Sequence, residues 1–184
     1  MSETIRQPIV AGRFYEADSN RCAADAAQLC AADPFEGRSL PQTLVGGIVP
    51  HAGWVCSGRV AGLVWRALAE RSHARTIFLT GSVHTIDLTY PALDTFDRWR
   101  TPLGDIEVDV ALREAIAGLN EFQTVDDAHV REHALEVELP LIQQAFEEEV
   151  SIVPCMIPPR VEAAEWGDAL GELLLGWPAE VLVV

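Results

Sequence analysis

The sequence predicts an α/β fold in which a mostly parallel sheet is flanked by helices. Short apolar runs alternate along the chain with segments whose apolar residues recur at helical spacing. Such alternation is typical of parallel sheets, because helices make the crossovers between parallel strands. The chain has 184 residues, of which 49% are hydrophobic and 22% charged, which suits one globular domain over residues 1–184.

The first half of the chain is expected to contain two helices and two strands. Asp18 or Ser19 can cap the first helix, and Pro34 follows its end. Ser57 can cap the second helix. Paired glycines in the first strand indicate close packing of its backbone. The predicted elements are a helix over 18–32, a loop over 35–43, a strand over 44–49, a helix over 59–71 and a strand over 76–81.

The second half is expected to continue the alternation. Asp109 can cap a short helix, and Pro140 should either kink a later helix or begin its second half. The predicted elements are strands over 90–96 and 104–109, helices over 110–119 and 132–146, a strand over 150–157, a helix over 161–176 and a strand over 179–184.

The charge of the chain excludes two classes of partner. The net charge is −15, and the thirteen basic residues are scattered. Binding to nucleic acid or to an anionic membrane needs a concentrated basic face. No apolar stretch approaches the roughly 20 residues of a membrane span, and the polar start MSETIRQ does not resemble a signal peptide. We therefore expect a cytoplasmic protein with no nucleic-acid or membrane partner.

The cysteines and two of the histidines suggest no chemistry of their own. Cys22, Cys30, Cys56 and Cys155 have no CxxC spacing, and without a secretion signal we expect free buried thiols. Cys56 lies near a predicted helix start, where a thiol pKa can fall, but we interpret it as a packed residue. His73 and His129 lie in polar connections and are expected to be exposed.

Two histidines follow predicted strands. His51 comes after the strand over 44–49, and His84 comes after the strand over 76–81. Their separation of 33 residues, with one helix between, matches a βαβ unit, so both should emerge at the same edge of the sheet. Such a pair with open positions would suit iron, copper or zinc. Taken singly, a histidine in such a position is more often a loop residue hydrogen-bonded to backbone than a metal ligand.

His133 lies at the predicted start of the helix over 132–146, beside Glu132. If this helix start faces the same edge, His133 and Glu136 could relay a proton or orient a metal ligand. A second interpretation is that acidic residues gather at a helix start because the helix dipole favours them.

Five motifs occur in order along the chain, and together they resemble a known family. They are AGRFYEAD (11–18), VPHAGWVCSG (49–58), IFLTGSVHTIDL (77–88), RTPLGDIEVD (100–109) and HVREHALEVELPLIQ (129–143). They resemble the MEMO family, whose bacterial members are called AmmeMemoRadiSam system protein B. The resemblance implies a fold similar to the class III extradiol dioxygenases, with the active pocket at the strand ends.

The resemblance also implies roles for three residues. His51 and His84 match the family's two metal-binding histidines, and His133 matches a pocket histidine that we expect to be catalytic or to support the ligands. The implied metal is iron or copper, and zinc would also fit. The family's third ligand is a cysteine near its C-terminus, and Cys155 lies elsewhere in the fold. We therefore expect a single MEMO-like domain that lacks the family's C-terminal portion, with weak metal affinity, impaired activity and a tendency to form homo-oligomers.

Two classes of function remain open on the sequence. The first is a metal-dependent redox protein of dioxygenase ancestry, acting on an unknown small molecule and working with other AmmeMemoRadiSam system proteins. The second is a non-catalytic module that holds a peptide or protein in the same cleft. A phosphate-bearing ligand would need local basic residues, for which Arg59 and Arg100 are the candidates.

Overall fold

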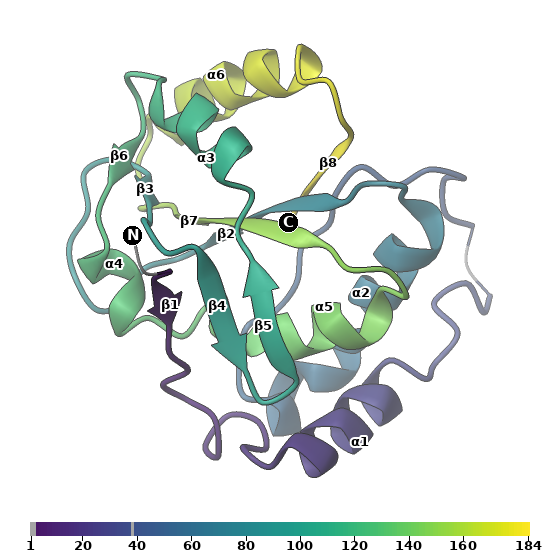
Figure 1. The fold of residues 1–184 in the computed structure, drawn as a ribbon. Helices are drawn as coiled ribbons and strands as arrows, with labels where there is room; N and C mark the ends of the chain where they lie inside the picture. The colour runs from purple at the N-terminus through teal and green to yellow at the C-terminus, as the bar shows by residue number, and fades with distance from the viewer. Residues whose placement is uncertain (1–2, 38) are drawn as a thin grey trace.

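The strands of the protein form two sheets (Figure 1). A computed structural model describes residues 3–37 and 39–184. The larger sheet has the strand order β6-β3-β7-β2-β8, and the smaller sheet has the order β1-β4-β5. The strands are β1 (Ile5–Arg6), β2 (Thr76–Gly81), β3 (Ala92–Leu93), β4 (Arg98–Thr101), β5 (Gly104–Glu107), β6 (Gln123–Thr124), β7 (Ser151–Met156) and β8 (Val181–Val183).

The larger sheet is mostly parallel, which confirms the predicted fold class. β2 runs parallel to both β7 and β8, and β3 runs parallel to β6. The pairing of β3 with β7 is antiparallel. In the smaller sheet, β4 and β5 form an antiparallel hairpin, and β1 adds to β4 in parallel.

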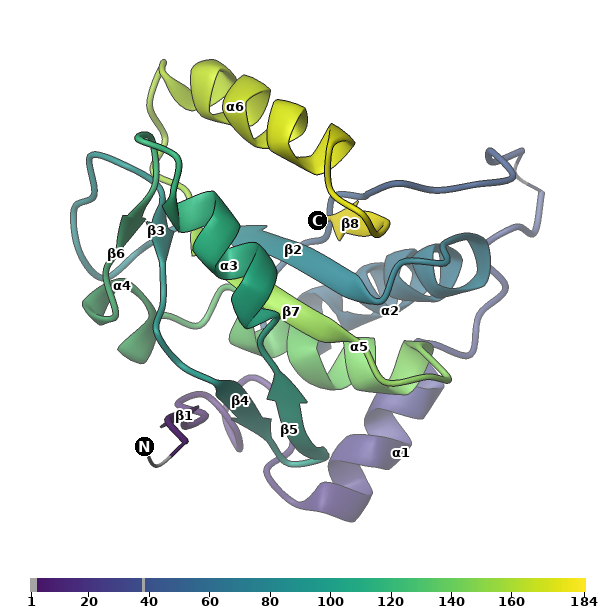
Figure 2. The same cartoon turned by 45° about the horizontal axis from the view of Figure 1, so that its top comes forward.

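Helices cover both faces of the larger sheet (Figure 2). α3 and α6 lie on one face, whereas α2 and α5 lie on the other. Asp18 and Asp109 cap α1 and α3 by accepting hydrogen bonds from backbone N–H groups, as predicted. The helices are α1 (Ser19–Leu29), α2 (Trp54–Arg71), α3 (Val110–Ala117), α4 (Asp127–Val130), the 3-10 helix η1 (Glu136–Glu138), α5 (Leu139–Ala145) and α6 (Ala163–Leu175).

The central strands supply side chains to two apolar cores. Successive residues of a strand point to opposite faces of the sheet, so strands buried on both faces read as continuous apolar runs. Ile77 and Leu79 of β2 belong to the core that includes Trp65 of α2. Phe78 packs on the opposite side, in the core that includes Trp166 of α6. This two-sided burial explains why the apolar run over 76–81 predicted β2 correctly.

The predicted buried strand over 44–49 is wrong in its extent and its burial. Only Gly46 of this segment forms a ladder bridge, in parallel with Val183, and the side chain of Ile48 is 94% exposed. A Cβ atom at Gly46 would lie 2.3 Å from the carbonyl oxygen of Val183, so only glycine allows this approach. The segment is therefore an extended edge beside β8.

Other boundaries also differ from the predictions. α2 begins at Trp54, five residues before the predicted start, because Gly53 rather than Ser57 occupies its N-cap. The strand predicted over 90–96 is reduced to β3. The predicted helix over 132–146 is replaced by a turn, η1 and the short helix α5, which has Pro140 in its first turn. Proline is tolerated there because the first N–H groups of a helix lack partners within the helix.

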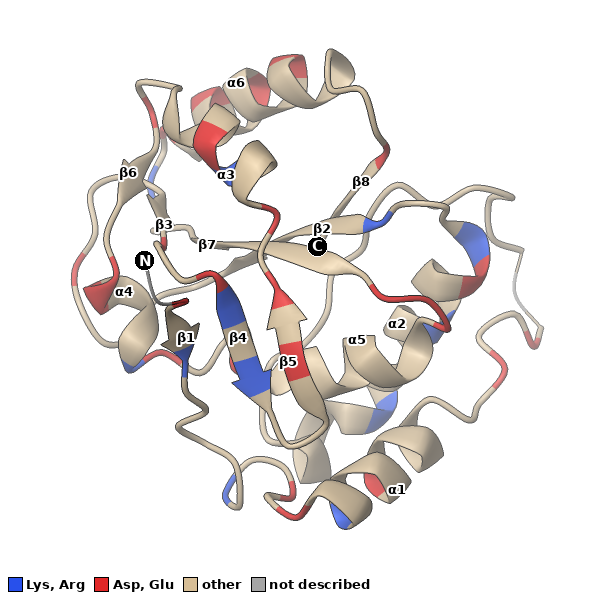
Figure 3. Ribbon diagram, in the orientation of Figure 1, with Lys and Arg blue, Asp and Glu red and all other residues tan. Residues whose placement is uncertain are grey.

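Charged residues are spread over the whole molecule (Figure 3). The two arginines of β4 are the most visible basic pair on the ribbon. Arg98 donates to Glu107 at 3.0 Å and Arg100 donates to Asp105 at 2.8 Å, so both are neutralised within the hairpin. Over residues 3–37 and 39–184, no helix has the length and apolar character needed to cross a membrane.

Candidate metal centre

Three histidines from separate parts of the chain lie together at one edge of the larger sheet. His51 follows the edge segment beside β8, His84 follows β2, and His133 lies in the turn before η1. The ring centroid of His84 is 5.4 Å from that of His51 and 5.1 Å from that of His133. The remaining pair, His51 and His133, is separated by 6.1 Å. The structure thus brings together all three candidate site residues.

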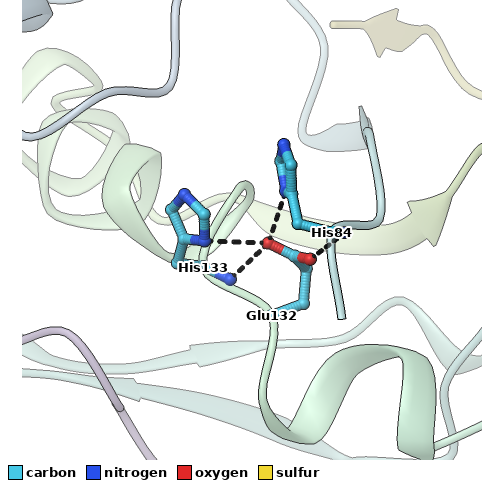
Figure 4. A group of neighbouring side chains, drawn as sticks. All are labelled: His84, Glu132 and His133. Carbon is cyan, nitrogen blue, oxygen red and sulfur yellow. Dashed lines mark hydrogen bonds and ion pairs between the residues drawn. The ribbon is translucent and has the colours of Figure 1, made fainter. Parts of the chain in front are cut away.

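A buried carboxylate joins two of these histidines (Figure 4). Glu132 Oε1 lies 3.1 Å from Nδ1 of His84 and 3.0 Å from Nδ1 of His133. The Glu132 side chain has no exposed surface, whereas the His84 side chain is 46% exposed and that of His133 is 25% exposed. Since Glu132 occupies the Nδ1 side of both rings, their Nε2 atoms are turned away from it. A carboxylate on the far nitrogen of a histidine is the usual arrangement behind a metal ligand.

Glu132 is held as an anion by backbone donors. It accepts hydrogen bonds from the backbone N–H groups of His84, His133 and Ala134. Burial by itself would raise the pKa of Glu132, but the hydrogen bonds from His84, His133 and Ala134 outweigh it and lower the pKa below its usual value. The carboxylate is therefore ionised at neutral pH and can fix the orientation of both rings.

The electrostatics of His51 favour a neutral ring. Burial lowers its pKa, and the neighbouring His84 and His133 lower it further, against an opposing effect of Glu132. No hydrogen bond to the His51 ring is found among the described residues. A neutral imidazole with a free nitrogen is the form that binds metals.

The turn that carries Glu132 and His133 is anchored from the N-terminus of the chain. The Arg6 guanidinium donates to the carbonyl oxygen of Glu132 at 2.6 Å and to that of His129 at 3.2 Å. It also pairs with the buried Glu136 and lies over the Trp99 ring, 4.5 Å from its centroid. Arg6 therefore holds both ends of the segment 129–136.

Further contacts position the three rings. Phe14 packs edge-on against His133, with ring centroids 4.9 Å apart, and its carbonyl accepts a hydrogen bond from the backbone of Trp54 at the start of α2. At the end of β2, a Cβ atom on Gly81 would lie 2.6 Å from a methyl group of Leu135. Glycine at this point lets the β2 terminus approach the turn that carries His133.

Some predictions around the site are wrong. Glu136 does not work with His133; it accepts hydrogen bonds from the backbone of Ile9 and Val10 and from the Tyr15 hydroxyl, and so fixes the N-terminal segment. His129 is fully buried rather than exposed, because its Nε2 lies 2.9 Å from the carbonyl oxygen of Ala92.

The predictions for the cysteines and for His73 are confirmed in part. Cys56 is exposed on α2, not packed. The other three cysteines are buried and free, and His73 is exposed, as predicted. Arg59 is exposed on α2.

The role of Glu132 was not recognised from the sequence. Its only signal is its place next to His133, which does not reveal that its carboxylate also reaches His84, 48 residues earlier. The ligand atoms of His84, Glu132 and His133 all lie within 4.8 Å of one another, which allows a second arrangement with Glu132 as a direct ligand. We favour the outer position, because the Glu132 oxygens already accept three backbone hydrogen bonds.

Proteins of similar sequence support the family resemblance that the motifs indicate. A MEMO1 family protein of Methanopyrus kandleri is 36% identical over 177 residues, which cover 90% of this chain and 61% of the relative. One from Methanosarcina mazei is 36% identical over 184 residues, covering 92% of this chain and 61% of the relative. One from Aquifex aeolicus is 34% identical over 174 residues, covering 92% and 62%.

The family match extends over nearly the whole chain. The chain spans about three fifths of the length of the curated relatives it matches. The family model described as Memo-like protein matches residues 6–184, which include all three clustered histidines. The chain therefore belongs to the Memo-like protein family.

Proposed function

We propose that the protein binds one redox-active metal ion, iron or copper, through His51 and His84, and that it is a metal-dependent oxidoreductase of dioxygenase ancestry. The observation that carries the proposal is a His51 ring with no hydrogen-bond partner among the described residues, 5.4 Å centroid to centroid from a His84 ring whose Nδ1 contacts Glu132. Two imidazoles that each bind one ion at about 2.0–2.1 Å have ring centres roughly 5 Å apart. Zinc would fit the same nitrogen ligands.

The surrounding residues support this assignment. Glu132 fixes the His84 ring through Nδ1, which leaves Nε2 for the ion. In this proposal His133, whose ring centroid is 5.1 Å from that of His84, accepts a proton from a molecule bound beside the pair. Bound iron or copper would supply open coordination positions and one-electron chemistry. The substrate in this proposal is a small molecule held in the cleft at the strand ends.

Metal uptake tests the proposal. The protein should bind about one iron or copper ion per chain at saturation, measured by equilibrium dialysis with elemental analysis. Loss of a residue that only orients a metal ligand weakens metal binding by about 10- to 100-fold. His51→Ala and His84→Ala each remove a proposed ligand, so each should weaken metal binding by more than this. His133→Ala should retain the metal, because in this proposal the His133 ring accepts a proton and is not a metal ligand.

The exposed His73→Ala is the matched control and should bind metal like the unaltered protein. Equal metal content in the control and in His51→Ala would refute the proposal. A metal-free protein that captures a peptide would instead support a binding module.

A further inference from the structure

A cavity of about 310 Å³ lies beside His51, where β2 and β8 end. This volume is at the lower end of the range for small-molecule sites, which runs from about 300 to 1,000 Å³. Its walls are mainly apolar, and its ionisable side chains are His51 and Glu138. The apolar residues that line it include Val49, Leu79 and Leu135.

Glu138 places a buried carboxyl group with few polar partners in the wall of this cavity. It is only 4% exposed, and within the described part of the chain its side chain has one hydrogen bond, from Trp65 Nε1 to Oε2 at 2.6 Å. Among the described residues, no donor reaches Oε1 and no cation pairs with the carboxyl group. Burial accordingly raises the pKa of Glu138 to about 8, against a smaller lowering by the Trp65 hydrogen bond.

Other buried acids near the site are compensated. Glu136 pairs with Arg6, and Glu132 accepts three backbone hydrogen bonds. Burying a carboxyl group without such partners is costly, so one that persists beside a cavity calls for a complementary group. The net charge of −15 disfavours an anion as that group.

We propose that this cavity binds a small primary amine, with its ammonium group on Oε1 of Glu138 and its apolar body against Leu79 and Leu135. An ammonium donates hydrogen bonds to the free oxygen and supplies the cation that the carboxylate lacks. A neutral alcohol of the same shape fills the apolar space but supplies no positive charge that could pair with the ionised carboxylate.

The inference deepens the proposed function, because it names the class of molecule that would be presented to the ion at His51. Only the reaction of the amine at the ion depends on the proposed metal function. Binding of the amine depends on Glu138 and the cavity, and so it can be measured on metal-free protein.

Benzylamine and benzyl alcohol are suitable probes, because they share an apolar body and differ in charge at pH 7.5. We expect benzylamine to bind the metal-free protein about ten- to a hundredfold more tightly than benzyl alcohol, as judged by titration calorimetry. Glu138→Gln should remove this preference and leave the affinity for the alcohol within about threefold. Glu165→Gln, on the exposed surface of α6, is the matched control and should change neither affinity.

A second measurement locates the ligand. The indole N–H of Trp65 donates to Glu138, so its nitrogen–proton NMR signal should shift when benzylamine is added to the unaltered protein. The Glu138→Gln variant should fold, since the amide oxygen still accepts from Trp65 and no ionisable group is buried. Its signal should stay in place on addition of the amine.

The inference is overturned if the two probes bind equally, or if Glu138→Gln binds benzylamine like the unaltered protein. Iron uptake is measured on the same samples. Retained metal with no amine preference refutes the amine site alone, whereas amine binding without metal uptake refutes the proposed metal function alone.

Discussion

Replacing Arg6 with methionine is expected to destabilise the protein by about 3–5 kcal/mol, the usual cost of removing one partner of a buried ion pair. The side chain of Arg6 is 2% exposed and that of Glu136 is fully buried. Without the guanidinium, Glu136 would remain as a buried charge, and the carbonyl groups of His129 and Glu132 would lose their donor. Urea denaturation of the two proteins measures the difference.

An exposed ion pair provides the control for this experiment. Arg21 contacts Glu16 at 2.8 Å, with the arginine side chain 70% exposed, so Arg21→Met should cost no more than about 1 kcal/mol. The double variant Arg6→Met with Glu136→Gln should recover part of the loss, because no charge is then buried alone. A loss below about 1 kcal/mol in Arg6→Met would contradict the structural role given to this ion pair.

The second large effect is expected at Glu132. Glu132→Gln should weaken metal binding by about 10- to 100-fold, because the amide cannot provide the negative charge that orients His84 and strengthens it as a ligand. The lowered pKa of Glu132 means that this charge is present at neutral pH in the unaltered protein. Competition with a metal chelator measures the affinity.

Glu121→Gln, away from the cluster in sequence and partly exposed, is the matched control for Glu132→Gln. The circular dichroism spectrum of each variant should match that of the unaltered protein. If a folded Glu132→Gln binds metal with unchanged affinity, Glu132 does not act on the metal site.

The elements that were predicted well carry strong local signals. β2 and β7 are continuous apolar runs, because both faces of the sheet are covered. α1 and α3 were predicted with Asp18 or Ser19 and with Asp109 as candidate N-caps, and the aspartate occupies the cap in both helices. In these segments the local sequence and the tertiary contacts favour the same structure.

The missed elements depend on distant partners. β4 was not predicted, since its two arginines mask an alternation in which Trp99 and Thr101 face inward. The turn before η1 replaces a helix because Arg6, more than 120 residues earlier, binds its carbonyl groups. The early start of α2 involves another distant partner, because the Trp54 indole donates to the carbonyl of Val137.

The site was partly predictable for the same reason. His51 follows an extended segment that bridges β8 in parallel, and His84 follows β2, so parallel topology brings the two positions to one edge. The position of His133 required the family motif. The link through Glu132 could not be predicted, because it depends on how the turn is held by Arg6 and by the N–H groups of the backbone.

The position of the ion tests the central claim most directly. Anomalous diffraction from crystals of the 184-residue chain loaded with iron or copper would locate it. We predict one ion within about 2.0–2.2 Å of a ring nitrogen of His51 and of one of His84, with Glu132 on the far side of the His84 ring. An ion bound directly by the Glu132 oxygens, or one bound away from both His51 and His84, would contradict the account.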